Sequence, residues 1–253
     1  MSEVIIEQRG FIIVMTLNRP AQRNAVNRAV STALAGALDL LDADPALRVG
    51  IVTGSGGSFC SGMDLKAFLA GERPELEGRG FAGVTETPPV KPLIAAVEGF
   101  ALAGGCELAL ACDLIVASTD AVFGLPEAAR GLVAGSGGLV RLRDRIPPAI
   151  ALEFALTAKR MDAETAHRWG LVNRLAPAGG ALDEALALAH EIAANAPLST
   201  VASKKIMAMA PDWSANERWE LQRPIVEEVL ASKDAQEGAR AFAEKRAPQW
   251  SGR

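Results

Sequence analysis

The stretch ALAGGCELALACDLIVAS, residues 101–118, is the most informative part of this 253-residue chain. It is built almost entirely of small and apolar residues, contains the pair Gly104–Gly105, and carries Glu107 near its middle. It predicts a helix that starts after the glycine pair and leads into a buried strand. Carboxylates are rarely buried unless they are paired or used, because removing water from the ionised form is costly. Glu107 is therefore a candidate for proton chemistry.

Outward from this stretch, the sequence alternates between strands and helices. Hydrophobic periodicity predicts a hairpin in residues 4–18, a helix over residues 27–42, and buried strands over residues 49–54 and 92–99. From about Gly135 onward it predicts helices almost only, the last ones over residues 181–195, 197–210, 216–231 and 234–245. The mixture of glycine, proline and charge in residues 70–90 is typical of a mobile surface segment. We expect an α/β core over residues 1–195 followed by a C-terminal helical region over residues 196–253.

Composition limits the classes of function. The chain is 49% hydrophobic and 22% charged with a net charge of −4, which fits a globular enzyme and disfavours non-specific nucleic-acid binding. Cys60, Cys106 and Cys112 match no zinc spacing, and their odd number argues against a disulfide framework. The N-terminus lacks the apolar core of a signal peptide, and acidic residues interrupt the longest apolar run. We therefore expect a cytoplasmic protein with no metal site and no membrane segment.

A second carboxylate and two glycine-rich loops complete the candidate site. Glu127 lies between FGLP and GLVAGSGG, 20 residues after Glu107. The loops FCSGMDLK, residues 59–66, and ALAGGCEL, residues 101–108, each enter a predicted helix, at Met63 and Gly104. The first backbone N–H groups of a helix are unpaired and carry its positive dipole, so two such ends could hold an oxyanion. Either loop alone is explained equally well as a tight connection.

These motifs, in this order and spacing, resemble the enoyl-CoA hydratase (crotonase) superfamily. NRPAQRNAVN, residues 18–27, and AFAEKRAPQW, residues 241–250, are also similar to that family, so the resemblance covers essentially the whole chain. It implies a crotonase fold of repeated ββα units followed by a helical trimerisation region. It also implies a homotrimer or homohexamer, an acyl-CoA substrate, and no cofactor beyond the coenzyme A of the substrate.

The resemblance implies a role for each matching residue. The N–H groups of Met63 and Gly104 would bind the thioester oxygen, Glu107 would hold water, and Glu127 would deliver a proton. The reaction would be syn addition of water across the 2,3 double bond of a 2-enoyl-CoA. Substrate contacts fall on Ala25, Met63, Asp64, Leu65, Lys66 and Gly104, and on Phe242 and Lys245 from a neighbouring subunit.

Several of these residues also have a purely structural interpretation. Asp64 is more typical of an N-cap than of a catalyst. Lys66, one helical turn past Met63, could approach the nucleotide of coenzyme A, and a solvated surface lysine explains it nearly as well. Either glutamate could cap a helix or pair with Arg130 or Arg141. His167 and His190 have no partner constellation and are interpreted as structural or surface residues. Cys106 lacks an activating histidine and is interpreted as a packed residue.

Other functions remain open at this stage. Residues 80–86, 145–175 and 241–253 look like the carnitinyl-CoA dehydratase (crotonobetainyl-CoA hydratase) branch of the family. Isomerases of the family commonly lack the first glutamate, and a non-catalytic acyl-CoA-binding or RNA-binding relative would keep the fold without turnover. A nicotinamide enzyme is disfavoured because the glycine loop VTGSGG, at the end of the strand over residues 49–54, does not continue as G-x-G-x-x-G, and because the chain has no tyrosine to serve a short-chain dehydrogenase. A serine hydrolase is disfavoured because G-x-S-x-G does not occur. The sequence departs from the common pattern of the family at Ala103, Glu98 and Ala134. These departures bear on the size and shape of the acyl group that the site accepts more than on the type of reaction.

Overall fold

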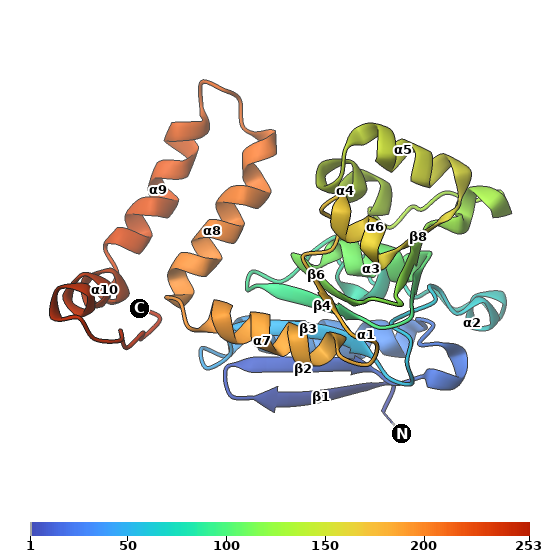
Figure 1. The fold of residues 1–253 in the computed structure, drawn as a ribbon, viewed down its shortest axis with the longest axis horizontal. Coiled ribbons are helices and arrows are strands. Elements are labelled where there is room, and N and C mark those ends of the chain that lie inside the picture. Colours follow the sequence, from blue (N-terminus) through green and yellow to red (C-terminus); the bar gives the residue numbers. More distant parts are fainter. Residues whose placement is uncertain (1) are drawn as a thin grey trace.

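The computed structural model describes residues 2–253, which form two β-sheets covered by helices (Figure 1). The large sheet has the strand order β1-β2-β3-β4-β6-β9, with bounds Val4–Arg9, Ile12–Leu17, Val49–Gly54, Leu93–Val97, Leu114–Ser118 and Arg174–Ala176. The small sheet has the order β5-β7-β8, with bounds Phe100–Leu102, Val122–Gly124 and Arg160–Asp162. The predicted hairpin is confirmed, because β1 pairs with β2 antiparallel, whereas all other pairs in the large sheet are parallel.

Helices lie on both faces of the large sheet. Their bounds are α1 Arg28–Ala43, α2 Leu65–Leu69, α3 Gly104–Ala111, α4 Gly138–Arg145, α5 Pro148–Thr157, α6 Ala163–Arg168, α7 Ala181–Ala193, α8 Pro197–Met209, α9 Arg218–Leu230 and α10 Lys233–Glu244. Four 3₁₀ turns are η1 Pro20–Gln22, η2 Phe81–Gly83, η3 Pro126–Arg130 and η4 Ala210–Asp212. On one face, α7 places Ala185, Ala189 and Ala193 against the sheet, since residues four apart share one side of a helix. The larger core, with residues of α1 and α3, covers the other face.

The repeated ββα units implied by the resemblance bring the two candidate carboxylates to one place. The run β4-β5-α3 is followed by β6-β7-η3, with β4 parallel to β6 and β5 parallel to β7. Leu102, the last residue of β5, is in register with Gly124, the last residue of β7. The chain therefore leaves both strands at the same edge of the small sheet, into the segments that carry Glu107 and Glu127.

One sequence prediction needs an addition and another is wrong. The region after Gly135 is mostly helical, as predicted, but it also contains β8 and β9, because strands of three residues are too short to give a periodic pattern. Residues 70–90 are not a surface segment throughout, because Phe81–Thr85 are buried. The glycines that suggested mobility include Gly80 and Gly83, which have positive φ and make close turns against the core.

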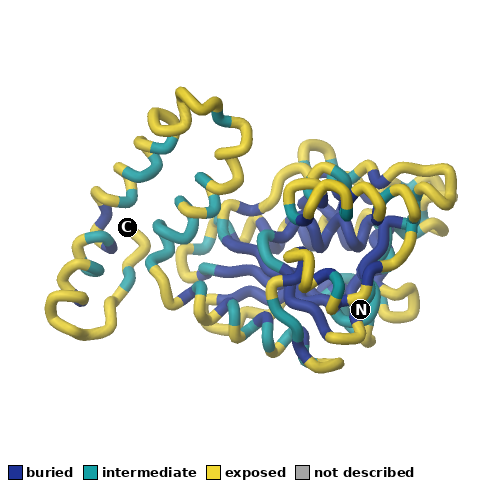
Figure 2. The backbone as a smooth tube through the Cα atoms, turned by 45° about the horizontal axis from the view of Figure 1, so that its top comes forward, coloured by how far each residue is buried: buried dark blue, intermediate teal, exposed yellow. Residues whose placement is uncertain are grey.

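The last three helices form an arm that extends away from the two sheets (Figure 1). Figure 2 shows that most of this arm is exposed, in contrast to the buried strands. Among the residues that the structure describes, α8 and α9 contain no buried residue. Large exposed apolar side chains lie on this arm, namely Met207, Met209, Trp219, Leu221, Leu230 and Phe242. The arm thus lacks a hydrophobic core of its own within one chain.

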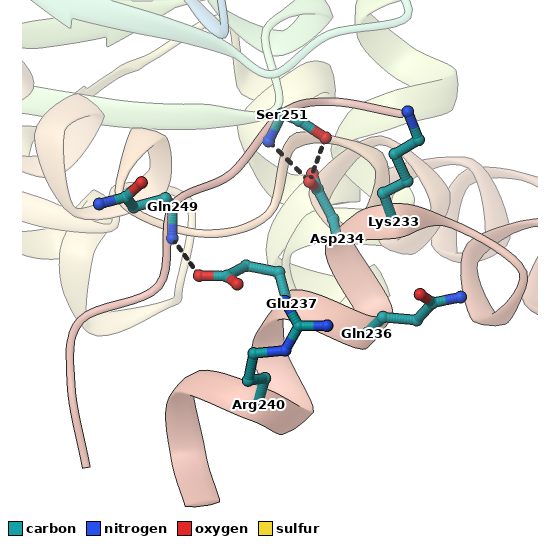
Figure 3. Close-up of a pocket in the computed structure, with 7 residues that line it drawn as sticks. All are labelled: Lys233, Asp234, Gln236, Glu237, Arg240, Gln249 and Ser251. Atoms are coloured by element: carbon teal, nitrogen blue, oxygen red, sulfur yellow. Dashed lines mark hydrogen bonds between the residues drawn. The ribbon is translucent and has the colours of Figure 1, made fainter. Parts of the chain in front are cut away.

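The C-terminal tail folds back along α10 and holds it in place. Asp234 accepts hydrogen bonds from the N–H and the hydroxyl of Ser251, at 2.6 and 2.9 Å, and Glu237 accepts one from the N–H of Gln249 at 2.8 Å (Figure 3). Trp250 donates its indole N–H to the carbonyl of Ala194, just beyond α7, at 2.7 Å. The tail therefore connects α10 directly to the end of the core helix α7.

The three cysteines are buried free thiols. No helix in residues 2–253 is both long enough and apolar enough to cross a bilayer. Within the same residues, His, Cys, Asp and Glu side chains do not gather in groups of three or more that could hold a metal ion.

Candidate active site

The two glycine-rich loops lie side by side. Cys60 and Ala101 form a parallel β-bridge. The N–H of Cys60 donates to the carbonyl of Phe100 at 2.9 Å, and the N–H of Leu102 donates to the carbonyl of Cys60 at 3.0 Å. Residues 59–66 and 101–108, which are about 40 positions apart in sequence, are thus joined by backbone hydrogen bonds.

Two backbone amides lie at this junction, one in each loop. Among residues 2–253, neither the N–H of Met63 nor that of Gly104 has a hydrogen-bond acceptor. They lie close together, because a Cβ added to Gly62 would be only 3.2 Å from the nitrogen of Gly104. Gly104 is also the first residue of α3, where the helix dipole is positive. The pair can stabilise negative charge on an oxygen placed between them.

Ala103 has a backbone conformation that favours glycine. Its φ is 52° and its ψ is −130°, and its N–H donates to the carbonyl of Gly124 at 2.8 Å. Strained conformations of this kind persist only where the surroundings enforce them, and they are frequent at functional sites. Here the turn at Ala103 directs the chain from β5 into α3 and leaves the N–H of Gly104 free.

Phe81 is a neighbour of the site that the sequence did not reveal. Its ring lies against Gly104, since a Cβ added to Gly104 would be 2.6 Å from the ring atom Cζ. Only 3% of Phe81 is exposed. The ring therefore keeps water from one side of the α3 N-terminus, which strengthens hydrogen bonds formed there. No pattern in residues 70–90 indicated this contact, because it joins segments that are distant in sequence.

Glu107 is buried and anchored by backbone N–H groups. It is 3% exposed, and its Oε1 accepts hydrogen bonds from the N–H of Ser136 at 2.7 Å and of Gly138 at 2.9 Å. Burial raises the pKa of Glu107 above the ordinary value of 4.5, and the nearby Glu127 carboxylate raises it further. The two N–H bonds and the cation of Arg141 act in the opposite direction and lower the pKa. Glu107 therefore does meet the start of α4, as a capping carboxylate would, but with one oxygen only.

Glu127 lies on η3 without such an anchor. Its Oε2 is buried and has no hydrogen-bond partner among the described residues. Burial raises the pKa of Glu127 above 4.5, and its own backbone N–H and the cation of Arg130 oppose the shift. The carboxylates of Glu107 and Glu127 are close enough for the charge of Glu127 to affect Glu107. Two carboxylates whose pKa values are raised in a shared site can hold a proton near neutral pH.

The other residues expected near the acyl-CoA divide into two groups. Asp64 is confirmed as the N-cap of α2, because its Oδ1 accepts from the N–H of Lys66 and of Ala67 at 3.0 and 3.2 Å. It also forms an ion pair with Arg19 at 2.8 Å. Ala25 is buried next to the same loop, at 8% exposure, whereas Leu65 and Lys66 are exposed. This first group lies beside Met63.

The second group lies on the arm. Phe242, 88% exposed, and Lys245 are at the end of α10, at the opposite end of the molecule from α2 (Figure 1). Within one chain, the structure does not bring these two residues to Met63, Gly104 and the glutamates.

Residues interpreted as structural have structural surroundings. His167 forms a hydrogen bond of 2.9 Å through Nδ1 with the carbonyl of Val172, and His190 is exposed on α7. Burial raises the pKa of the Cys106 thiol to about 12, so it stays protonated and is not a nucleophile.

Comparison with known proteins identifies the family. A sequence profile described as enoyl-CoA hydratase/isomerase matches residues 7–253. The chain belongs to the enoyl-CoA hydratase/isomerase family. It is 45% identical over 253 residues to the carnitinyl-CoA dehydratase of Proteus mirabilis, covering 97% of each chain.

Solved structures of this enzyme family have the same fold as this chain. An enoyl-CoA hydratase, EchA1, from Mycobacterium marinum superposes with a TM-score of 0.99 at 59% identity, and each chain is covered completely. A carnitinyl-CoA hydratase from Mycobacterium avium superposes with a TM-score of 0.80 at 46% identity, again with complete coverage. The predicted crotonase fold and the predicted class of enzyme, a hydro-lyase, are thereby confirmed.

Proposed function

We propose that this family member catalyses the reversible syn addition of water across the 2,3 double bond of a 2-enoyl-CoA thioester. The observation that carries the proposal is the arrangement of a buried carboxylate, Glu107, and a half-buried one, Glu127, both with raised pKa, beside two backbone amides that have no acceptor among the described residues. This reaction requires hydrogen-bond donors at the thioester oxygen, because negative charge develops there as water attacks C3. It also requires a positioned base for the water and a positioned acid for C2.

Each group has one task in the hydration direction. The N–H groups of Met63 and Gly104 donate to the thioester oxygen. Glu107 accepts a proton from water while the oxygen of that water bonds to C3, and Glu127 gives its proton to C2. The π electrons of the double bond form the new C2–H bond. The net result is one H and one OH added, and the proton balance is restored by transfer between the two carboxylates or through solvent.

The different anchoring of the two glutamates supports this division. In Glu107, Oε1 is held by two N–H donors, which stabilise the ionised form and leave Oε2 for water. In Glu127, the buried Oε2 has no hydrogen-bond donor among the described residues, and burial outweighs the local backbone N–H, so the protonated form is favoured relative to an exposed glutamate. Dehydration uses the same steps in reverse.

The identity of the acyl group is a separate part of the proposal. A curated relative at 45% identity is named carnitinyl-CoA dehydratase, whereas a solved structure at 59% identity is named enoyl-CoA hydratase. We propose a general 2-enoyl-CoA as the substrate and crotonobetainyl-CoA as the second candidate. Loss of the enoyl-thioester absorbance, followed in parallel with crotonyl-CoA, longer 2-enoyl-CoAs and crotonobetainyl-CoA, distinguishes the two. Formation of a 2-enoyl-CoA from a 3-enoyl-CoA would instead indicate an isomerase.

We further propose that residues 196–253 assemble the protein into a trimer or a dimer of trimers in the cytoplasm. The arm has no core of its own, and its exposed apolar side chains suit burial against another subunit. In such an assembly, Phe242 and Lys245 would cover the nucleotide end of the coenzyme A bound to a neighbouring chain. Sedimentation at several protein concentrations tests the assembly directly.

The catalytic roles are tested by removing each ionisable group at constant shape. We expect Glu107→Gln and Glu127→Gln each to lower turnover by at least about 10²-fold, the range for a positioned acid or base, with acyl-CoA binding retained. Glu153→Gln, an exposed glutamate on α5, is the matched control and should behave as wild type. Turnover near the wild-type rate in either catalytic variant would refute the two-carboxylate mechanism. Binding of acyl-CoA by the wild-type protein without any turnover would establish a non-catalytic binder.

A further inference from the structure

Arg141 connects the turn that anchors Glu107 with the segment that packs beside Gly104. It lies on α4 and is partly buried. One of its guanidinium nitrogens donates to the carbonyl of Thr85, 56 residues earlier in the chain. A guanidinium is a planar, permanently charged donor, so it can hold two distant segments in a fixed relation.

The guanidinium also lies against the turn that anchors Glu107. This turn consists of Ser136, Gly137 and Gly138, and its first and third N–H groups donate to Glu107. Gly137 has a φ of 88°, and a Cβ added there would collide with the guanidinium of Arg141. A Cβ added to Gly138 would be 2.6 Å from Cγ of Glu107. Arg141 therefore packs directly on the backbone whose N–H groups aim at the Glu107 carboxylate.

Through Thr85, Arg141 is also connected to Gly104, whose N–H is one of the two proposed oxyanion donors. Thr85 closes the buried segment that begins at Phe81, with its N–H donating to the Phe81 carbonyl at 3.3 Å. Phe81 in turn lies on Gly104. A single side chain thus fixes the turn behind Glu107 and the segment that packs on the N-terminus of α3.

The charges around Glu107 make Arg141 its main cationic neighbour. The groups that influence its ionisation are Glu127 on η3 and Arg141 on α4. Of the other ionisable groups nearby, Cys106 on the same helix is a protonated thiol. On α4, Arg143 and Asp144 are exposed, and Arg145 donates to the carbonyl of Cys112 at the far end of α3.

We propose that Arg141 is a positioning residue. It aligns the Glu107 carboxylate with the N–H groups of Met63 and Gly104, and its cation stabilises the ionised form of Glu107 beside Glu127. This inference rests on the proposed function, because it concerns the same carboxylate. It predicts an effect on turnover that exceeds the effect on binding, since Arg141 acts through Glu107 and not on the substrate.

The test compares Arg141→Met, Arg141→Lys and the control Arg143→Met, which removes an exposed cation from the same helix. We expect Arg141→Met to lower kcat about 10-fold or more with little change in KM, because small displacements of a catalytic group are costly. Loss of the cation also raises the pKa of Glu107, so the acidic limb of the kcat/KM profile should move to higher pH. Arg141→Lys should leave that limb at the wild-type pH, because the charge remains, yet lower kcat because the planar contacts are lost. Arg143→Met should match wild type.

A wild-type kcat and acidic limb in Arg141→Met would overturn the inference. If that variant does not fold, Arg141→Lys decides alone, and an unchanged kcat overturns it. Glu107→Gln is measured in the same series. Normal turnover in Glu107→Gln refutes the proposed mechanism itself, whereas an inactive Glu107→Gln together with a normal Arg141→Met refutes only the role of Arg141.

Discussion

At the scale of single residues, the proposed catalytic role of Glu107 conflicts with the stability of the fold. Its carboxylate is buried, and only one oxygen has hydrogen-bond donors from the backbone. Burial of the charged form is unfavourable, and the raised pKa expresses that cost. Residues selected for chemistry commonly reduce the stability of the fold in this way.

The conflict predicts a stabilising substitution. The pKa of Glu107 is raised in the folded chain above 4.5, so its favourable contribution is present below that pH and is lost as the pH rises through the folded-state pKa. Glu107→Gln keeps a carbonyl oxygen for the N–H groups of Ser136 and Gly138 but removes the charge. We expect its thermal midpoint at pH 8 to exceed that of wild type by a few degrees, and the difference to vanish near pH 4.

Calorimetry or fluorescence melting of both proteins across this pH range provides the measurement. Glu153→Gln on the exposed side of α5 should show no such pH-dependent gain. A Glu107→Gln protein that is less stable than wild type at pH 8 would show that the N–H bonds outweigh burial.

At the scale of elements, α7 is capped from a distant strand. The N-cap residue of α7 is Gly180, which has no side chain to accept a hydrogen bond. Glu98, just after β4, accepts instead from the N–H of Gly179 at 3.0 Å and of Ala181 at 2.8 Å. The carboxylate of Glu98 therefore supplies the helix cap that Gly180 lacks, which gives the acidic residue at position 98 a structural role.

Removing this distant cap should weaken the fold. We expect Glu98→Ala to lower the free energy of unfolding by about 1–2 kcal/mol, the usual cost of losing a helix cap with its hydrogen bonds. Denaturant titration at a fixed protein concentration measures it. Asp183→Ala, an exposed acid in the first turn of the same helix, should cost clearly less. Equal costs for the two substitutions would show that the helix dipole, not the hydrogen bonds of Glu98, is responsible.

Long periodic elements could be predicted from the sequence, and short pairings could not. The helix predicted over residues 27–42 is α1 at Arg28–Ala43, and Asn27 caps it by accepting from the N–H of Val30. In contrast, β5, β7, β8 and β9 have only three residues each, too few for a period of two to appear. Their existence depends on partners far away in the sequence.

The same distinction applies to the site. Glu107 and Glu127 could be identified as candidates because they are carboxylates in apolar surroundings. Phe81 and Arg141 could not, because their importance depends on contacts with Gly104 and Thr85 that only the folded chain creates. The sequence thus indicated the candidate catalytic groups, but not the groups that hold them in place.

At the scale of the whole molecule, the C-terminal tail joins the arm to the core. Trp250 donates to Ala194 beyond α7, and its ring lies near Gly238 of α10. We expect Trp250→Ala to free α10 from the core, so that backbone amides of α9 and α10 exchange hydrogen faster and KM for acyl-CoA rises. Gln249→Ala is the matched control, because only the backbone N–H of Gln249 contacts Glu237.

Hydrogen exchange followed by mass spectrometry resolves the two helices, and steady-state kinetics on the same preparations gives KM. Unchanged exchange in Trp250→Ala would show that the carboxylates of Asp234 and Glu237 hold the tail without the indole.

The sparse burial of the arm also has a thermodynamic consequence. Helices α8 and α9 bury no residue within one chain, so in the proposed assembly most of the free energy that keeps them in position would come from contacts between molecules. Such free energy follows mass action and depends on protein concentration, unlike that of the sheets. Dilution would then act on this protein as a mild and selective denaturant, loosening the arm first while the strands and the two carboxylates stay in place.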